Sequence, residues 1–491
     1  MKQVILIMVD TQRQDMLSCY DKNSVKTPAL DSIAEEGTLF QNAFTCQPVC
    51  GPARSAIFTG LYPHSNGMLA NSMQLGANVK NAGEWLSPKG VECGYIGKWH
   101  LDGGDYYGNG ECPKGYNPKY WYDMRNYLED DFTDEERKQS RVNMALRFDD
   151  PEEKNTYAHR CADRAIKFID EFKDKNFFLT LSLDEPHDPS VCPKRFVKLL
   201  GKTGFKIKRT PNVKASLNDK PEHHKVWSKA YSKIPFIAMR YFYKSLFACN
   251  AFCDYEIGRV LEKVKERGLD PMLIYTSDHG DMIFSHKLMG KGAAMYNEIT
   301  RVPFLIKGEG IDKGINKTAV SQIDILPTIM TYFGITPPKI LEGEPLQKIN
   351  MDSQRDVMIE FTRYEVDLDG FMGFQPIRCL TDGRYKLVIN LMTSDEFYDM
   401  DIDPYEMKNL INDVSYEKIR NDMHDRLIEK MNQTRDPFRG YYWYCRPWRK
   451  DSKPSFSFTG YTRQPEEEGL TRLDYATGLP IKEYVRKKGI K

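Results

Sequence analysis

The sequence lacks the long apolar run that a membrane-spanning helix requires, and it has almost no net charge. No stretch approaches the roughly 18 consecutive apolar residues that cross a bilayer. The 70 Lys and Arg residues are matched by 69 Asp and Glu residues. Such a chain offers no general attraction for nucleic acid or an acidic membrane, so a polyanionic ligand needs a local cluster of cations. We expect neither nucleic acid nor a membrane as a partner.

The cysteine pattern excludes a disulfide framework. The eleven cysteines are odd in number, irregularly spaced and contain no Cys-x-x-Cys pair, which is typical of reduced thiols in the cytosol. The N-terminal apolar run Val4–Val9 lacks the basic region, the longer apolar stretch and the small-residue cleavage site of a signal peptide. These features predict a cytoplasmic protein whose first β-strand lies at its start.

Length and composition predict a large α/β protein. A chain of 491 residues, with 41% hydrophobic and 12% aromatic residues, buries a sizeable core. We expect a catalytic domain over residues 1–370, built on a large, mixed, mostly parallel sheet flanked by helices. A smaller C-terminal subdomain, residues 371–491, would contain an antiparallel sheet around Ile377–Asn390, a helix around Ser415–Met431 and an aromatic, basic tail.

Several predicted strands stop abruptly at polar residues. Segments with helical periodicity, such as Ala162–Phe172 and Ser245–Glu266, lie between them, and this alternation predicts a parallel sheet. In such sheets ligands bind beyond the carboxyl ends of the strands, so the polar residues should meet at one edge. The four strands, each with the polar residues that follow it, are Val4–Val9 before Asp10, Gly94–Gly97 before Lys98–His100, Phe177–Leu183 before Asp184–Pro189, and Met272–Ser277 before Asp278–Asp281.

Asp10, Asp278 and His279 offer hard oxygen ligands and one nitrogen, which suit a divalent cation such as calcium or magnesium. Taken alone, an aspartate after a strand is more often a helix cap or a turn residue. The alternative for Lys98 is a solvated surface residue, and the alternative for His100 is a structural histidine. Individual residues therefore leave both interpretations open, and it is their convergence that points to a site.

The segment Cys50–Gly60 combines three unusual features. Cys50 is a convertible thiol, and Pro52 fixes the backbone two residues later. If a helix follows, Arg54 lies one turn from Cys50 and faces the same ligand, and Gly60 ends the helix in a left-handed cap. The alternative is a turn ahead of an ordinary helix.

Together these motifs resemble the sulfatase family of the alkaline-phosphatase superfamily, over nearly the whole chain. Cys50–Arg54 resembles the family signature, in which the cysteine is oxidised to formylglycine. The other matching segments follow in the family's order: Asp10, Thr27–Asp31, Phe40–Phe44, Gly97–Leu101, Pro186–Pro189, Thr276–Gly280, Gly290–Gly292, Tyr385–Val388 and Tyr398–Glu406.

The resemblance implies a metal site. Asp10, Asp278 and His279 would be ligands, and the formylglycine made from Cys50 would complete the set. The expected ion is Ca²⁺, with Mg²⁺ and Mn²⁺ as alternatives. Many members have a second aspartate where this chain has Thr11, so Thr11 would coordinate weakly, act through water or leave the place to Gln12.

The resemblance also implies catalytic roles. Modified Cys50 would be the nucleophile, and the hydrated aldehyde would turn over with the help of His100. The remaining roles are sulfate and hydroxyl binding by Arg54, Lys98 and Lys291, and protonation of the leaving oxygen by His187.

Substrate identity is less constrained. The expected substrate is a small sulfated saccharide or an aryl sulfate, with a 2-O-sulfated hexuronide from glycosaminoglycan breakdown as one candidate. Aromatic loops near Tyr106 and Tyr120 suit sugar faces, and they suit packing within a surface loop equally well. Arg363, Arg378 or the stretch 439–450 could reach over the pocket; the tail could instead wrap another subunit of a homo-oligomer. A formylglycine-generating maturase is an implied partner.

Two other functions compete with a sulfatase. A phosphonate monoester or phosphodiester hydrolase of the same superfamily can share the Cys50–Arg54 segment, whereas the Lys98–His100 string favours a sulfatase. A non-catalytic carbohydrate-binding relative should have lost the convertible cysteine or a metal ligand, and this chain retains both.

Overall fold

The computed structural model describes residues 1–130, 132–139, 152–202, 210–367, 373–451 and 477–480. The chain divides into two compact units, Met1–Arg439 and Gly440–Lys491. The second contains the short helix α14 (Tyr441–Tyr444), and most of the predicted tail lies outside the described residues. None of the described helices has both the length and the apolar character needed to cross a bilayer.

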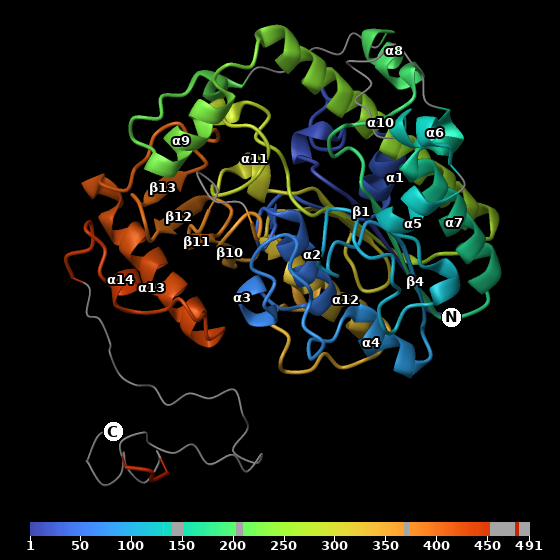
Figure 1. Ribbon diagram of the computed structural model, residues 1–491. Coiled ribbons are helices and arrows are strands. Elements are labelled where there is room, and N and C mark those ends of the chain that lie inside the picture. The colour runs from blue at the N-terminus through green and yellow to red at the C-terminus, as the bar shows by residue number, and fades with distance from the viewer. Residues whose placement is uncertain (131, 140–151, 203–209, 368–372, 452–476, 481–491) are drawn as a thin grey trace. The chain divides into compact units, whose positions relative to one another are not determined.

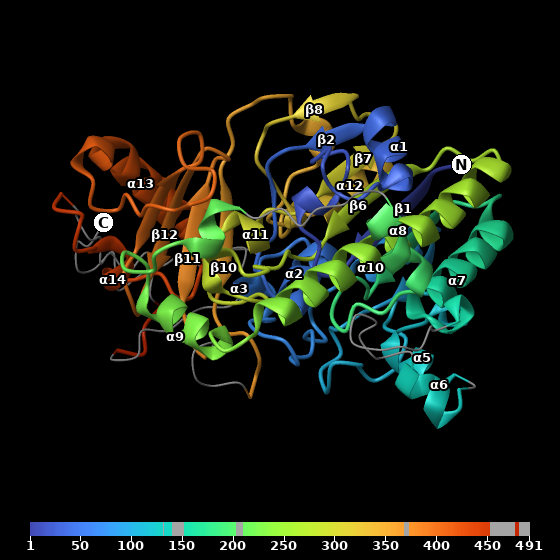
Figure 2. The ribbon, with the colours of Figure 1, turned by 90° about the horizontal axis from the view of Figure 1, so that it is seen from above.

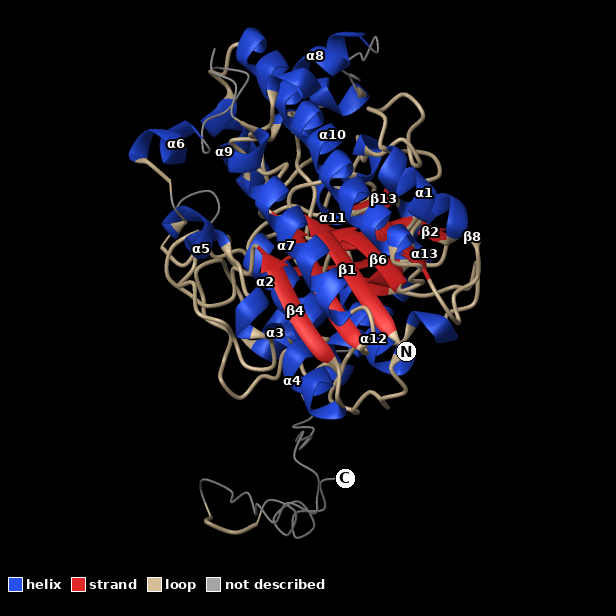
Figure 3. Cartoon of the chain, turned by 90° about the vertical axis from the view of Figure 1, so that its right-hand side faces the viewer, coloured by secondary structure: helices blue, strands red, loops and turns tan. Residues whose placement is uncertain are grey.

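The first unit is built on a seven-stranded sheet (Figure 3). β1 pairs in parallel with β5 and β6, and β4 pairs in parallel with β5, whereas β7 runs antiparallel to β6 and to β2. The predicted mixed, mostly parallel sheet is therefore confirmed. In spatial order the strands are β4 (Glu92–Gly97), β5 (Phe177–Leu183), β1 (Gln3–Val9), β6 (Met272–Ser277), β7 (Phe304–Lys307), β2 (Thr38–Phe40) and β8 (Gly314–Asn316). A separate parallel pair joins β3 (Ala43–Phe44) to β9 (Val320–Ser321).

Alternate residues of β1 enter different apolar clusters, one on each face of the sheet. Ile5 and Ile7 pack in the cluster that contains Phe168 of α7, while Leu6 and Met8 pack in the one that contains Ile57. Burial on both faces explains why the central strands are continuously apolar in sequence. One cluster includes residues of α1 (Pro28–Glu36), α7 (Tyr157–Phe172) and α10 (Phe236–Glu266); the other includes residues of α2 (Cys50–Thr59), α4 (Ala82–Leu86) and α12 (Ile325–Tyr332) (Figures 1 and 3).

Strand register sets the position of the site. Val9, the last residue of β1, is paired with Leu183 of β5 and with Ser277 of β6. The next residue of each chain segment is an aspartate, so three carboxylates leave the sheet at the same level. The remaining helices of the first unit are α3 (Pro63–Asn66), α5 (Met124–Glu129), α6 (Asp134–Gln139), α8 (Lys194–Lys202), α9 (Glu222–Tyr231), α11 (Asn297–Thr300) and α13 (Glu417–Gln433).

A second, antiparallel sheet follows the elements of the large sheet (Figure 2). The strands predicted around residues 377–390 and the helix predicted around 415–431 correspond to two of its strands and to α13. The sheet also includes a strand that precedes residue 370, the boundary predicted between the domains. Its strands, in order, are β10 (Val357–Phe361), β11 (Ile377–Thr381), β12 (Tyr385–Asn390) and β13 (Glu396–Asp399).

Arg378 lies in the interior of this subdomain instead of over a substrate pocket. Its side chain is fully buried, and its Nη2 atom donates to Asp436 at 2.9 Å. Its Nη1 atom donates to the Ile377 carbonyl at 2.8 Å, and the Glu360 carboxylate lies 3.8 Å from Nε. The guanidinium therefore links β11 to the segment that follows α13.

Removing the charge of Asp436 should destabilise the protein strongly, because Arg378 would keep a buried charge with a poorer partner. We expect Asp436→Asn to lower the free energy of unfolding by about 3–5 kcal/mol, measured by chemical denaturation. The matched control is Asp401→Asn, since Asp401 pairs with Arg384 at 3.1 Å on the surface. That change should cost less than about 1 kcal/mol. Equal losses for the two variants would contradict a structural role for the buried pair.

Candidate active site

The predicted nucleophile lies at the first turn of a buried helix. α2 begins at Cys50 and ends before Gly60, which adopts the predicted left-handed conformation (φ 65°). The backbone N–H of Gly51 donates to Asn71 Oδ1 at 2.8 Å, which fixes the start of the helix. The prediction of a helix that places Arg54 one turn from Cys50 is confirmed.

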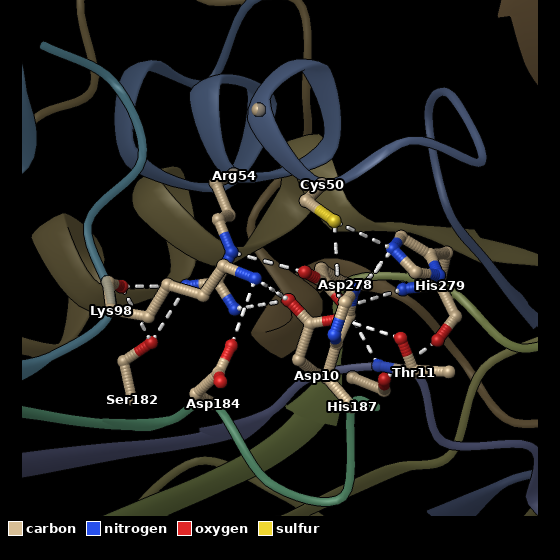
Figure 4. Close-up of polar contacts among 12 residues, drawn as sticks. Asp10, Thr11, Cys50, Arg54, Lys98, Ser182, Asp184, His187, Asp278 and His279 are labelled. Carbon is tan, nitrogen blue, oxygen red and sulfur yellow. Dashed lines mark hydrogen bonds and ion pairs between the residues drawn. The ribbon is translucent and has the colours of Figure 1, made fainter. Parts of the chain in front are cut away.

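Cys50, Asp10, Asp278 and His279 form one buried group (Figure 4). Their potential ligand atoms all lie within 4.8 Å of one another. Cys50 Sγ is 3.1 Å from His279 Nε2 and 3.9 Å from Asp10 Oδ1, and His279 Nε2 is 3.7 Å from an oxygen of each carboxylate. Two carboxylates, an imidazole and residue 50 therefore face a single point, as a divalent cation requires.

The hydrogen bonds of His279 leave one nitrogen available to a metal. Its Nδ1 atom lies 2.8 Å from the Gly280 carbonyl, which can only accept, so Nδ1 carries the proton. Nε2 then presents its lone pair to the carboxylates. A backbone carbonyl that fixes the tautomer in this way is the usual support of a metal-binding histidine.

Thr11 and Gln12 differ in what their side chains contact. Thr11 Oγ1 donates to Asp10 Oδ1 at 2.6 Å, beside the group. Its backbone adopts a positive φ of 61°, unfavourable for a β-branched residue, and its N–H donates to Asp278 Oδ1 at 3.2 Å. The Gln12 amide bonds with Asn250 and, at 2.5 Å, with Tyr275. Both ends of the Gln12 side chain are thus engaged away from the four-residue group.

Arg54 joins the two carboxylates. Its Nε atom donates to Asp278 Oδ2 at 3.0 Å and its Nη2 atom to Asp10 Oδ2 at 3.2 Å, with all three side chains fully buried. Its Nη1 atom donates to the Lys98 carbonyl and to Ser182 Oγ, each at 2.7 Å. Lys98 Nζ in turn lies 2.8 Å from Asp10 Oδ2 and 3.0 Å from Asp184 Oδ1.

The two carboxylates have opposite pKa shifts. Burial opposes ionisation of Asp10, but the charges of Lys98, His187 and Lys291 outweigh it and hold the pKa of Asp10 well below its usual value. Burial, followed by the negative charge of Asp10, raises the pKa of Asp278 to about 6. Two like charges at close range disfavour each other, and a bound cation relieves that repulsion. The donor set therefore fits a divalent metal.

The unmodified thiol is acidic. Burial and Asp10 would raise the pKa of Cys50, yet Lys291, Lys98 and His279 outweigh them and hold it well below the usual thiol value. The position thus favours a negative charge despite two neighbouring carboxylates. An anionic sulfate ester, or an oxyanion formed at residue 50, would find the same positive surroundings.

His187 and Lys291 form the opposite side of the site. Lys291 Nζ lies 2.9 Å from His187 Nε2, and His187 Nδ1 lies 2.8 Å from the Asp188 carbonyl. Burial, Lys291 and Lys98 all lower the pKa of His187, but Asp10 and Cys50 raise it above its usual value. Because Nδ1 donates to a carbonyl, Nε2 is the atom that can exchange a proton with a ligand.

His100 has a less satisfied environment. Its backbone is in the left-handed region (φ 60°), and its Nδ1 atom is buried with no hydrogen-bond partner among the described residues. Its carbonyl oxygen would be 3.4 Å from a Cβ at position 51, so the loop that carries His100 lies against the start of α2. An imidazole with an unused nitrogen beside the helix that carries Cys50 suits proton transfer.

Three residues that complete the site were not among the predicted catalytic residues and metal ligands. Ser182 and Asp184 hold Arg54 and Lys98, and Tyr106 contacts Lys98 Nζ at 2.9 Å and His187 Nδ1 at 3.2 Å. Lys98 Nζ also lies 4.2 Å from the centre of the Tyr106 ring. Asp184 had a sequence signal, since it follows its strand as Asp10 follows β1. Tyr106 had none beyond its place in an aromatic loop, for which a sugar contact and packing at the surface were both open.

Family models match most of the chain. The sulfatase model matches residues 2–335, and the model of the N-sulphoglucosamine sulphohydrolase C-terminal region matches residues 285–433. The chain is 41% identical over 485 residues to the uncharacterized sulfatase YidJ of Escherichia coli K12, covering 97% of this chain and 96% of that one. It is 25% identical to an N-acetylglucosamine-6-O-sulfatase of Bacteroides thetaiotaomicron, covering 88% and 87% of the two chains.

Solved structures share the fold. One protein, solved in complex with its substrate D-glucosamine-2-N,6-O-disulfate, superposes with a TM-score of 0.70 at 21% identity and covers 89% of this chain and 98% of its own. A phosphonate monoester hydrolase from Silicibacter pomeroyi gives a TM-score of 0.74 at 17% identity and covers 89% and 96%. Since the family model spans well over half of the sequence, the chain belongs to the sulfatase family of the alkaline-phosphatase superfamily and is a sulfuric ester hydrolase.

Proposed function

We propose that this enzyme hydrolyses a sulfate monoester on a small carbohydrate, using a formylglycine made from Cys50 and a divalent cation. The observation that carries the proposal is the position of Cys50, whose Sγ atom lies 3.1 Å from His279 Nε2 within the group of potential metal ligands. Sγ stands in for the oxygen that formylglycine would place there. Lys98, Lys291 and Arg54 surround the same point with buried positive charge.

The cation would be held by Asp10, Asp278, His279 and an oxygen of residue 50, with Ca²⁺ favoured by the oxygen-rich set. When bound, it supplies positive charge that stabilises the sulfate oxygens and the nucleophile. Thr11 and Gln12 are the two candidates for one further metal ligand. Thr11 is the better candidate, because its hydroxyl contacts Asp10. The Gln12 side chain is bonded to Tyr275 instead.

Sulfate transfer would begin from the hydrated aldehyde of residue 50. One of its two hydroxyl oxygens gives its proton to a neighbouring carboxylate, that of Asp10 or Asp278, and attacks sulfur, and the bond between sulfur and the alcohol oxygen breaks. His187 gives the departing oxygen a proton from Nε2, an assistance typically worth about 10²–10⁴ in rate. Lys98, Arg54 and Lys291 neutralise the remaining sulfate oxygens, and losing one such donor costs about 10²–10³.

Turnover would use the second hydroxyl. His100 takes its proton, the carbon–oxygen double bond forms again, and the bond between that carbon and the sulfate oxygen breaks. Inorganic sulfate leaves and water adds to the aldehyde, which restores the diol. The thiol is converted beforehand by a maturase of the oxygen-dependent or radical type.

The two-hydroxyl mechanism predicts different outcomes for two substitutions at position 50. Cys50→Ser has one hydroxyl, so it should accept sulfate once and stall, whereas Cys50→Ala should be inert. Mass spectrometry of the tryptic peptide Thr27–Arg54 measures the aldehyde in the wild type and the sulfated serine in the variant. Turnover by Cys50→Ser at the wild-type rate would contradict the mechanism.

Metal binding should stabilise the protein through this site alone. Calcium at about 100 times its Kd should add about 2.7 kcal/mol to the free energy of unfolding, measured as a rise in Tm that chelation reverses. Asp278→Asn should abolish the rise. The control is Glu256→Gln. Glu256 belongs to a separate group with Glu153 and His159, so this variant should still show the calcium-dependent rise in Tm. A calcium response that survives in Asp278→Asn would place the ion elsewhere.

A phosphonate monoester or phosphodiester hydrolase is the rival function. The fold does not separate the two, because phosphonate hydrolases are among its structural neighbours. The Lys98–His100 string and the relatives that act on sulfated sugars support a sulfatase. Arg378 was one of the residues that could bind the carboxylate of a hexuronide substrate. It is buried with Asp436, so it does not support that choice of carbohydrate.

We expect kcat/KM on an aryl sulfate to exceed that on an aryl phosphonate diester by at least about tenfold. A panel of sulfated mono- and disaccharides, including 6-O-sulfated glucosamine and a 2-O-sulfated unsaturated hexuronide, should contain a better substrate than the aryl sulfate. Faster hydrolysis of the phosphonate would favour the rival. Activity confined to aryl sulfates would refute the carbohydrate assignment.

A further inference from the structure

The loop that carries Lys291 has little intrinsic stiffness. Lys291 lies between Gly290 (φ 74°) and Gly292 (φ 149°), two backbone positions that glycine adopts readily and other residues avoid. Its ammonium nevertheless lies 2.9 Å from His187 Nε2, at the centre of the site. Something outside the loop must fix its backbone.

Helix α9 supplies side-chain donors on both sides of Lys291. His223 Nε2 lies 2.7 Å from the Ala293 carbonyl oxygen, and His224 Nε2 lies 3.0 Å from the same oxygen. Trp227 Nε1 donates to the Met289 carbonyl at 3.2 Å. The two carbonyls stand two residues before and two residues after Lys291, so α9 holds the loop at both ends.

Both histidines can donate a hydrogen bond to the Ala293 carbonyl while they are neutral. Burial lowers the pKa of each to about 3, which keeps them uncharged at any working pH. A carbonyl only accepts, so both carry the proton on Nε2. Their Nδ1 atoms lie 3.1 Å from Thr393 Oγ1 and 3.2 Å from the Tyr296 hydroxyl. Each ring is therefore fixed from both sides.

The antiparallel sheet anchors α9 in turn (Figures 1 and 2). Lys220, just before α9, donates to the Tyr398 hydroxyl of β13 at 2.9 Å and to the Glu406 carbonyl at 2.8 Å. Lys386 of β12 donates to the Met295 carbonyl at 2.6 Å, further along the same loop. Gly290 is also held by Met282, whose N–H donates to its carbonyl at 2.8 Å, and by Asp281 Oδ1, which accepts from its N–H at 3.2 Å. Beyond Lys291, the contacts that hold the loop lead back to the small sheet.

We propose that His223 and His224 are positioning residues for Lys291: their shared hydrogen bonds to the Ala293 carbonyl hold the loop so that the ammonium meets the sulfate group. Their ring nitrogens bond to the loop, to Thr393 and to Tyr296, and not to Cys50. The inference rests on the proposed function, in which Lys291 binds sulfate. Small misplacements of such a group cost up to about 10² in rate.

A double-mutant cycle tests the proposal. His223→Leu/His224→Leu should lower kcat/KM on an aryl sulfate by about 10–100-fold and weaken inhibition by inorganic sulfate in proportion. In a Lys291→Ala background the same pair should change kcat/KM by less than about twofold, because the residue they position is gone. His223→Gln/His224→Gln, which retains an amide donor, should recover most of the activity.

His424→Leu is the matched control. His424 is also a buried histidine, but it lies on α13, which is not one of the elements that the proposal uses to hold the Lys291 loop. We expect it to leave kcat/KM within about twofold of wild type. If the histidine variant does not fold, Trp227→Phe removes the donor to the Met289 carbonyl and keeps a smaller aromatic ring, and its effect should also vanish in Lys291→Ala. Additive losses in the cycle would overturn the proposal, whereas a wild-type enzyme without sulfatase activity would overturn the proposed function instead.

Discussion

The whole site depends on one buried guanidinium. Asp10 and Asp278 face a common point without solvent, an arrangement whose desolvation cost only opposite charge and hydrogen bonds can offset. Arg54 bonds to both carboxylates and also to the Lys98 carbonyl and Ser182. Since Cys50 lies one turn earlier on the same helix, the interaction that holds the carboxylates also places the proposed nucleophile.

The sheet makes this arrangement possible through its register. Val9, Leu183 and Ser277 are paired across three neighbouring strands, so the aspartates that follow them leave the sheet together. Asp10 and Asp278 then face α2, while Asp184 binds Lys98. A shift of one residue in any of these pairings would turn an aspartate to the opposite face and dismantle the site. The continuous apolar strands that fix the register are therefore part of the catalytic apparatus.

The sequence predicted those parts of the molecule that depend on local pattern. Strand ends at Asp10 and Asp278, the helix from Cys50 to its glycine cap and the antiparallel sheet near the C-terminus each have a signal within a few residues. Contacts between residues that are distant in sequence had no such local signal. Arg378 was a candidate for substrate binding because an arginine looks the same in sequence whether it meets solvent or Asp436, 58 residues away. Tyr106 joins Lys98 and His187 only because its loop folds back over the strand ends.

The contribution of α9 to the site also could not be predicted, because its histidines bond to a loop that is distant in sequence. Adjacent histidines on a helix usually indicate metal binding or a solvated surface, and here both rings turn to one carbonyl of a glycine-flanked loop. Glycines on both sides of a lysine give its backbone many accessible conformations. Contacts with neighbouring residues must therefore restrict the backbone before the lysine can hold one position. Contacts from α9 and from β12 provide that restraint at the carbonyls of residues 289, 293 and 295. The antiparallel sheet therefore does more than extend the large domain, because part of the order of the Lys291 loop originates in it.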